Sequence, residues 1–180
     1  MLEALKMTPF GALHTVISLI AVVAGFTALV RNKEISPQLS VGKIYVAATI
    51  LPCLTGLGIF HHGGFGAPHV LAIITLFVVG VAVTAARTSL FGRVSRYVEM
   101  VSYSLTFFFH TIPAVNETAT RFPLGAPLAT SPEAPALQVA AGVLFIVFLV
   151  GAFLQVHWLR TRDQGSTFDA RLSGHEELSR

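Results

Sequence analysis

Five long apolar runs, separated by short polar connections, dominate the chain. The runs cover residues 8–30, 44–62, 67–86, 97–115 and 136–159. An α-helix rises about 1.5 Å per residue, so a run of about 20 apolar residues crosses the hydrocarbon core of a bilayer. The pattern predicts an all-α, polytopic membrane protein whose residues 1–160 form a bundle of five transmembrane helices. Residues 161–180 are polar and are predicted to be a mobile cytoplasmic tail.

Composition supports lipid as the main solvent of this chain. Its mean hydropathy is +0.71 and charged residues make up 12% of it, about half the share in an average soluble domain. The net charge of +3 comes from Lys and Arg scattered between the apolar runs. Nucleic-acid binding needs a basic face or cluster, so it is not expected. The single cysteine, Cys53, excludes an intrachain disulfide and a cysteine metal cluster.

The distribution of basic residues predicts the orientation. Ten Lys and Arg fall on one side of the predicted bundle: Arg31, Lys33, Lys43, Arg87, Arg93, Arg96, Arg160, Arg162, Arg171 and Arg180. The other side holds Lys6 and Arg121. Cytoplasmic loops carry the excess of basic residues, so the N-terminus is expected outside and the C-terminus in the cytoplasm.

Histidines gather at the outer side of this predicted bundle. His61 and His62 close the second run and His69 begins the third, on either side of a glycine-rich bend. His14 and His110 lie roughly 9 Å and 7.5 Å inside the outer ends of the first and fourth runs, by helical rise. Four helices are therefore expected to bring imidazoles to one layer. An ionisable side chain at membrane depth is costly and marks a candidate functional site.

Three chemical uses of this layer stay open. His14 and His110 could ligate a b-type haem axially from two helices. A Zn, Cu or Fe ion could be bound by several of His14, His62, His69 and His110, with Glu117 as a further ligand. The imidazoles could also exchange protons with a quinone-like headgroup. Against all three stands the alternative that each histidine is only a hydrogen-bonded side chain near the membrane interface.

The preferred function is an integral inner-membrane cofactor-binding protein, with haem or a transition metal serving electron transfer. The second class is a non-enzymatic accessory or assembly subunit of a larger membrane complex. The third is a small-solute or proton-coupled transporter, which is disfavoured because no acidic side chain is expected at membrane depth in the apolar runs. No hydrolytic motif is found, so the sequence leaves enzymatic activity open.

Several short segments resemble the uncharacterised bacterial membrane family DUF2306. They are Ala12-Leu13-His14 through Gly25, Val41-Gly42-Lys43-Ile44-Tyr45, Thr55-Gly56-Leu57 and Met100-Val101-Ser102-Tyr103-Ser104. The chain departs from the family at Leu39-Ser40 and at Ser95-Arg96, where the family has His-Arg. The resemblance covers roughly residues 10–112 and implies a multi-pass protein of the bacterial inner membrane.

Overall fold

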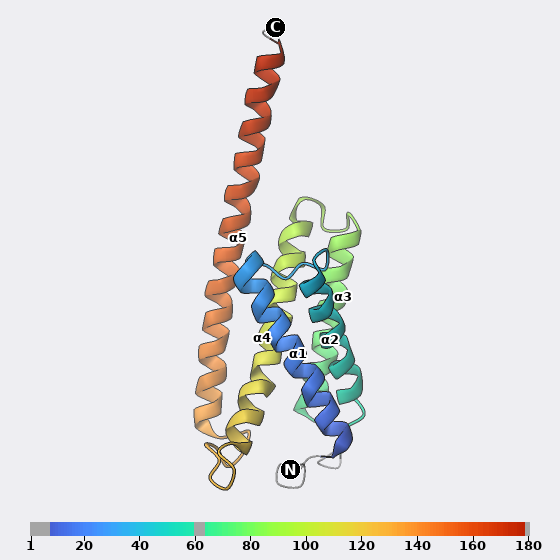
Figure 1. Cartoon of the computed structure of the whole chain (residues 1–180), viewed down its shortest axis with the longest axis vertical. Helices are drawn as coiled ribbons and strands as arrows, with labels where there is room; N and C mark the ends of the chain where they lie inside the picture. Colours follow the sequence, from blue (N-terminus) through green and yellow to red (C-terminus); the bar gives the residue numbers. More distant parts are fainter. Residues whose placement is uncertain (1–7, 60–63, 179–180) are drawn as a thin grey trace.

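The chain forms a bundle of helices (Figure 1). The computed structural model describes the backbone of residues 8–59 and 64–178, and the side chains in these ranges as far as residue 162. The described residues are mainly helical and contain no strand. The elements are α1 (Pro9–Asn32), α2 (Ser40–Gly56), α3 (Ala67–Arg87), the 3₁₀ helix η1 (Gly92–Val94), α4 (Ser95–Arg121) and α5 (Pro135–Leu178).

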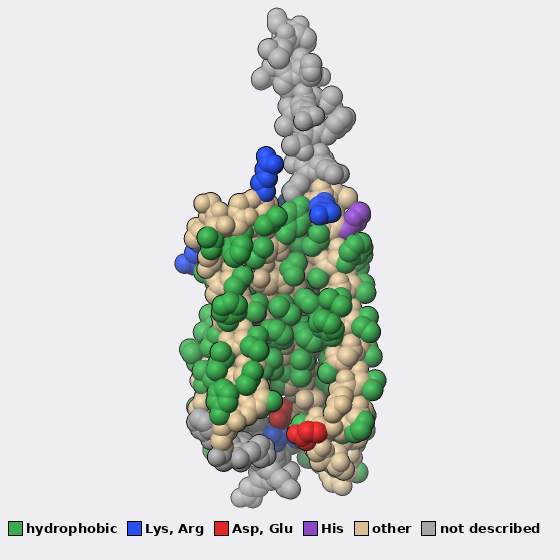
Figure 2. Space-filling view, turned by 180° about the vertical axis from the view of Figure 1, so that it is seen from behind, with side chains coloured by type: hydrophobic (Ala, Val, Ile, Leu, Met, Phe, Trp, Pro, Cys, Tyr) green, Lys and Arg blue, Asp and Glu red, His purple; other side chains and the backbone are tan. Residues whose placement is uncertain are grey.

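Three of these helices are long and apolar enough to cross a membrane: α1, α3 and the Pro135–Arg162 part of α5. This confirms the predicted helical class and its compatibility with a membrane. With 17 residues, α2 is shorter, and α4 carries more polar residues. Large apolar side chains on the outer faces of the long helices are exposed, among them Val23, Phe77 and Phe153 (Figure 2). Such a surface fits contact with lipid.

The fourth helix is longer than predicted. The prediction ended this helix at Val115. In the structure, α4 continues through Pro113 to Arg121. A proline removes one backbone hydrogen bond and can be accommodated inside an apolar helix. The connection to α5 is therefore residues 122–134, and Glu117 belongs to the helix.

Two other boundaries differ from the prediction. The second run was expected to stay helical to residue 62, but α2 ends at Gly56, and residues 60–63 lie outside the described residues. In the tail, predicted to be mobile, the backbone of α5 continues as helix to Leu178 and projects beyond the other helices (Figure 1).

Helix ends follow from local residues. At α1, the Thr8 side chain accepts a hydrogen bond from the Gly11 amide at 3.0 Å, and Pro9 occupies the first turn. Both are typical of a helix start. At α3, Pro68 lies in the first turn, and the Gly66 amide donates to His69 Nδ1 at 3.2 Å.

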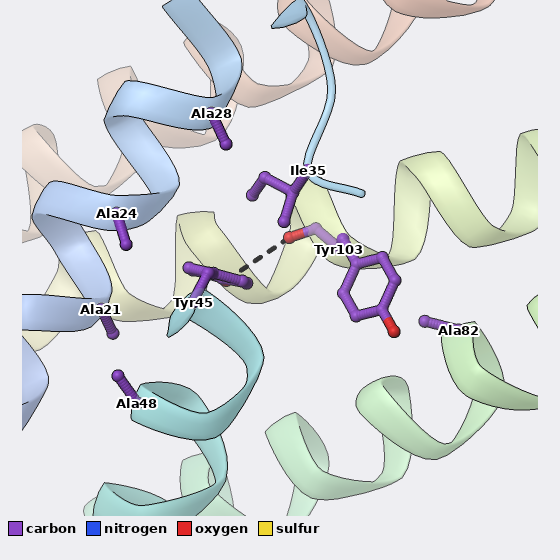
Figure 3. Close-up of a cluster of buried hydrophobic side chains, with 8 residues drawn as sticks. All are labelled: Ala21, Ala24, Ala28, Ile35, Tyr45, Ala48, Ala82 and Tyr103. Carbon is purple, nitrogen blue, oxygen red and sulfur yellow. Dashed lines mark hydrogen bonds between the residues drawn. The ribbon is translucent and has the colours of Figure 1, made fainter. Parts of the chain in front are cut away.

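The apolar core lies where α1 meets α2 and α4. Its small residues Ala21, Ala24, Gly25 and Ala28 are buried, which lets the helices approach closely. Tyr45 and Tyr103 fill the space opposite them (Figure 3). A Cβ added at Gly25 would lie 2.5 Å from Phe107 Cδ2 and 2.8 Å from Tyr45 Cε2. This position therefore requires glycine.

Gly25→Ala should accordingly destabilise the bundle, by about 1–3 kcal/mol as expected for overpacking of a filled core. Gly80→Ala is the matched control, because a Cβ at this α3 position meets no atom within 4 Å. Thermal unfolding of both variants in detergent micelles measures the difference. A Gly25→Ala protein as stable as the Gly80→Ala protein would contradict this packing.

Candidate functional site

Polar residues recur along one face of α4. Arg96, Glu99, Tyr103, Thr106, His110 and Glu117 are spaced by three, four or seven residues. At 3.6 residues per turn these six positions fall within an arc of about 80°. Four of them, Glu99, Tyr103, Thr106 and His110, are buried in the bundle. We call these six residues the polar face of α4.

In the middle of this face, hydroxyl groups connect α4 to α2. His110 Nε2 lies 3.1 Å from Thr49 Oγ1, and Tyr45 Oη lies 2.7 Å from Thr106 Oγ1. Thr49 also interacts with the Tyr45 hydroxyl. Thr49, Tyr45 and Thr106 are 0% exposed, so these groups have no bulk water to satisfy them. Buried polar groups without water depend on such mutual contacts.

The backbone fixes the direction of these contacts. Thr106 Oγ1 donates its proton to the Tyr103 carbonyl at 2.8 Å, because a carbonyl can only accept. Thr106 therefore accepts from Tyr45 Oη, which leaves the Tyr45 oxygen as an acceptor toward Thr49. His110 Nε2 and Thr49 Oγ1 are the next pair in this series.

His14 lies near the N-terminal end of α1 and contacts α2. Its Nδ1 lies 3.0 Å from Thr55 Oγ1. A Cβ at Gly56 would be 3.2 Å from His14 Cε1, so the ring lies close against α2. His14 also interacts electrostatically with His110 and with Glu117. The structure thus places His14, His110 and Glu117 in one region at the end of the bundle where α4 joins the loop to α5.

The other predicted ligands are His69, His62 and Glu117. His69 lies at the start of α3, where it stacks on Phe65 with ring centroids 5.1 Å apart and accepts from the Gly66 amide. His62 lies outside the described residues. Glu117 forms an ion pair with Arg121, one turn further along α4. Within residues 8–59 and 64–162, no group of three or more His, Cys, Asp or Glu side chains is placed to hold a metal ion.

Only the number of imidazoles on different helices matches what a haem requires. Two imidazoles on different helices are what axial ligation of a b-type haem requires. Threonine contacts occupy one nitrogen of each ring, leaving His14 Nε2 and His110 Nδ1. The haem therefore stays a prediction.

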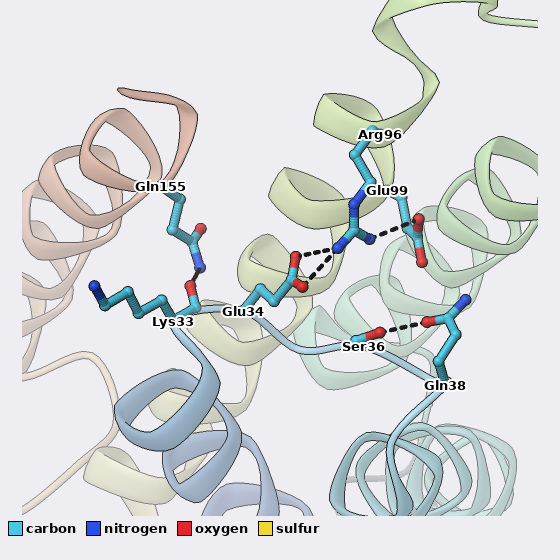
Figure 4. A network of polar contacts seen from close by, with 7 residues as sticks. All are labelled: Lys33, Glu34, Ser36, Gln38, Arg96, Glu99 and Gln155. Carbon is cyan, nitrogen blue, oxygen red and sulfur yellow. Dashed lines mark hydrogen bonds and ion pairs between the residues drawn. The ribbon is translucent and has the colours of Figure 1, made fainter. Parts of the chain in front are cut away.

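A charged network closes the opposite end of the polar face (Figure 4). Arg96 Nη2 donates to both carboxylate oxygens of Glu34, at 2.5 and 2.6 Å, and Arg96 Nη1 donates to Glu99 Oε2 at 3.1 Å. Glu34, in the connection between α1 and α2, is 8% exposed, and Glu99 is 4% exposed. One guanidinium thus serves two buried carboxylates from different segments.

The same end of the bundle holds α5 in place. Gln155 Nε2 donates to the Lys33 carbonyl at 2.8 Å (Figure 4). Ser104 Oγ donates to Gln155 Oε1 at 2.8 Å. Gln155 is 8% exposed on a helix that is otherwise largely open to the surroundings. Polar contacts of this kind between apolar helices contribute to their association.

The sequence interpretation missed Thr49, Tyr45, Glu34 and Glu99 as parts of a polar interior. It also described the apolar runs as free of acidic residues, whereas α4 contains Glu99 in its second turn and Glu117 near its end. The signal that could have revealed this face was the spacing of polar residues along α4. The contacts from α2 had no comparable signal, because a lone Thr or Tyr in an apolar helix is common.

Comparison with known proteins gives no relative from which to carry over a function. No protein-family model, curated protein or solved structure matches the chain. The resemblance to the DUF2306 family stays an expectation from short segments, and the site has to be interpreted from its own geometry.

Proposed function

We propose that this chain is a multi-pass membrane protein that passes protons through its interior along the polar face of α4. The observation that carries the proposal is the buried series of contacts from His110 through Thr49 and Tyr45 to Thr106. Chains of ionisable and hydroxyl side chains inside a bundle are typical of proton pathways. A lipid-facing helix would have no reason to bury four such residues.

The dimensions of the polar face fit this role. Glu99 and Glu117 are 18 residues apart on one helix, which corresponds to about 27 Å along its axis. The hydrocarbon core of a bilayer is about 30 Å thick. Carboxylates at both ends, with an imidazole and hydroxyls between them, give a path of proton-exchanging groups over most of that depth.

The proposed orientation places the network of Arg96, Glu34 and Glu99 at the cytoplasmic face. The same end holds the last turn of α1 with Arg31, and η1 with Arg93 (Figure 1). Lys and Arg side chains also gather at this end in Figure 2. Cytoplasmic loops carry the excess of basic residues. All five helices α1 to α5 cross the membrane in this proposal, with the N-terminus outside and His14, His110 and Glu117 toward the outer face.

Reporter fusions test this orientation. A periplasmic alkaline phosphatase reporter fused after Leu128, in the loop between α4 and α5, should be active. The same reporter fused after Arg93, in the connection between α3 and α4, should be inactive. A green fluorescent protein fused at the same two positions should give the opposite pattern. Equal reporter activity at both positions would contradict five crossings in this orientation.

Proton movement is measured in liposomes that contain the purified protein and a trapped pH-sensitive dye. A potassium gradient with valinomycin drives protons inward. Thr49→Val keeps the shape of the residue but removes its hydroxyl, and it should lower the influx by about tenfold, equivalent to about 1.4 kcal/mol on the barrier. His110→Asn should have a similar effect.

Thr118→Val is the matched control. Thr118 is an exposed residue of α4 whose hydroxyl donates to the Ala114 carbonyl within its own helix. It should leave the influx unchanged. Thermal unfolding of each variant shows whether the bundle is intact. Wild-type liposomes no more permeable to protons than empty ones would overturn the proposal, and the hydroxyl contacts would then serve only to hold the helices together.

Electron transfer with a bound haem is the second candidate. The observation in its favour is that His14 and His110, on different helices, each contact a threonine of α2 through one ring nitrogen. Protein purified from cells supplied with a haem precursor should then show a Soret band. The band should be lost in both His14→Ala and His110→Ala, and kept in His157→Ala, whose histidine is exposed and lies midway along α5. Absence of the band in the wild type would remove this candidate and leave the first untouched.

A further inference from the structure

Two polar atoms at the basic end of α4 are buried without a hydrogen-bond partner. They are Ser95 Oγ and Glu99 Oε1. Residues four apart on a helix lie one above the other on the same face. The two atoms therefore belong to neighbouring turns of α4, at the end where α3 and η1 lead into this helix. Each buried unsatisfied group needs a physical explanation.

The unpaired oxygen of Glu99 belongs to a network with an excess of negative charge. Arg96 engages both oxygens of Glu34 but only Oε2 of Glu99. Two carboxylates thus share a single guanidinium, which leaves the three side chains together with one negative charge. A buried charge without compensation is costly. The free oxygen of Glu99 is therefore placed to accept a positive charge.

Several segments contribute charged or ionisable groups near Glu99. Arg96 and Tyr103 come from α4 itself, and Glu34 comes from the connection between α1 and α2. Arg87, at the end of α3, interacts electrostatically with the Tyr103 hydroxyl, as does Glu99. Tyr103 thus follows Glu99 on the polar face, about one turn further along α4.

We propose that Ser95 Oγ and Glu99 Oε1 form a proton-binding site with one bridging water molecule at the cytoplasmic end of the path. This inference rests on the proposed function, because it names the group that exchanges protons with the cytoplasm. A hydronium ion between the two atoms transfers its proton to Glu99 Oε1. The carboxylate becomes a carboxylic acid, and the water that remains accepts a hydrogen bond from the acid and interacts with Ser95.

Infrared difference spectroscopy of the protein in lipid, recorded between neutral and acidic pH, tests the site. The wild type should show the carbonyl stretch of a protonated carboxylic acid shielded from water. Glu99→Gln should lose this band, and Ser95→Ala should shift it because the bridging water loses one partner. Glu133→Gln, in the exposed loop between α4 and α5, should keep it. A band that persists unchanged in Glu99→Gln would overturn the inference.

Proton influx separates this inference from the proposed function. In liposomes, Glu99→Gln should lower the influx by about tenfold, and Glu99→Asp should restore part of it because a carboxyl group remains. If Thr49→Val lowers the influx while Glu99→Gln has no effect on influx or spectrum, the path stands and the Glu99 site is wrong. If the wild type conducts no protons but shows the Glu99 band, the site stands and the proposed function is wrong. Thermal unfolding confirms that each variant is folded.

Discussion

Burial of the polar face of α4 against its neighbours is the constraint on which the rest of the bundle depends. In a bilayer, a side chain such as Glu99 or His110 is far more costly against acyl chains than against another helix. The structure meets this requirement by turning one arc of α4 inward and supplying partners from α2 and from the connection between α1 and α2. The remaining helices can then present apolar surfaces to lipid.

Small residues make this arrangement possible. Gly25 lets α1 approach Tyr45 and Phe107 closely. The Tyr45 hydroxyl contacts Thr106, and the Tyr45 ring makes an edge contact with His110, with ring centroids 6.1 Å apart. The apolar core and the polar interior therefore share residues. A change that loosens the contact of α1 with Tyr45 would also disturb the hydrogen bonds on the other side of the ring.

Most of the helical architecture could be predicted from the sequence, because long apolar runs between polar connections have few other solutions. The end of α4 could not, since Pro113 favours a break when the chain is considered without its neighbours. Charge counting pointed to one basic end, and the described basic residues do gather there (Figure 2). The side chains of Lys6, Arg171 and Arg180 lie outside the described part of the chain.

The candidate site was only partly predictable for a different reason. His14 and His110 were identified because imidazoles are rare in apolar runs, and their common level followed from helical rise. Their partners Thr49 and Thr55 depend on the rotation of α2 about its axis, which apolar periodicity does not fix in a helix surrounded by apolar groups. The ion pair of Arg96 with Glu34 joins residues 62 positions apart. Only the tertiary fold determines this contact.

Solid-state nuclear magnetic resonance of ring-labelled His110 in lipid bilayers tests the central claim most directly. Inward burial of the polar face predicts that the ring nitrogen Nε2 lies close to the Thr49 side chain and that the ring is shielded from acyl-chain protons. A ring with strong contacts to lipid and none to Thr49 would contradict it.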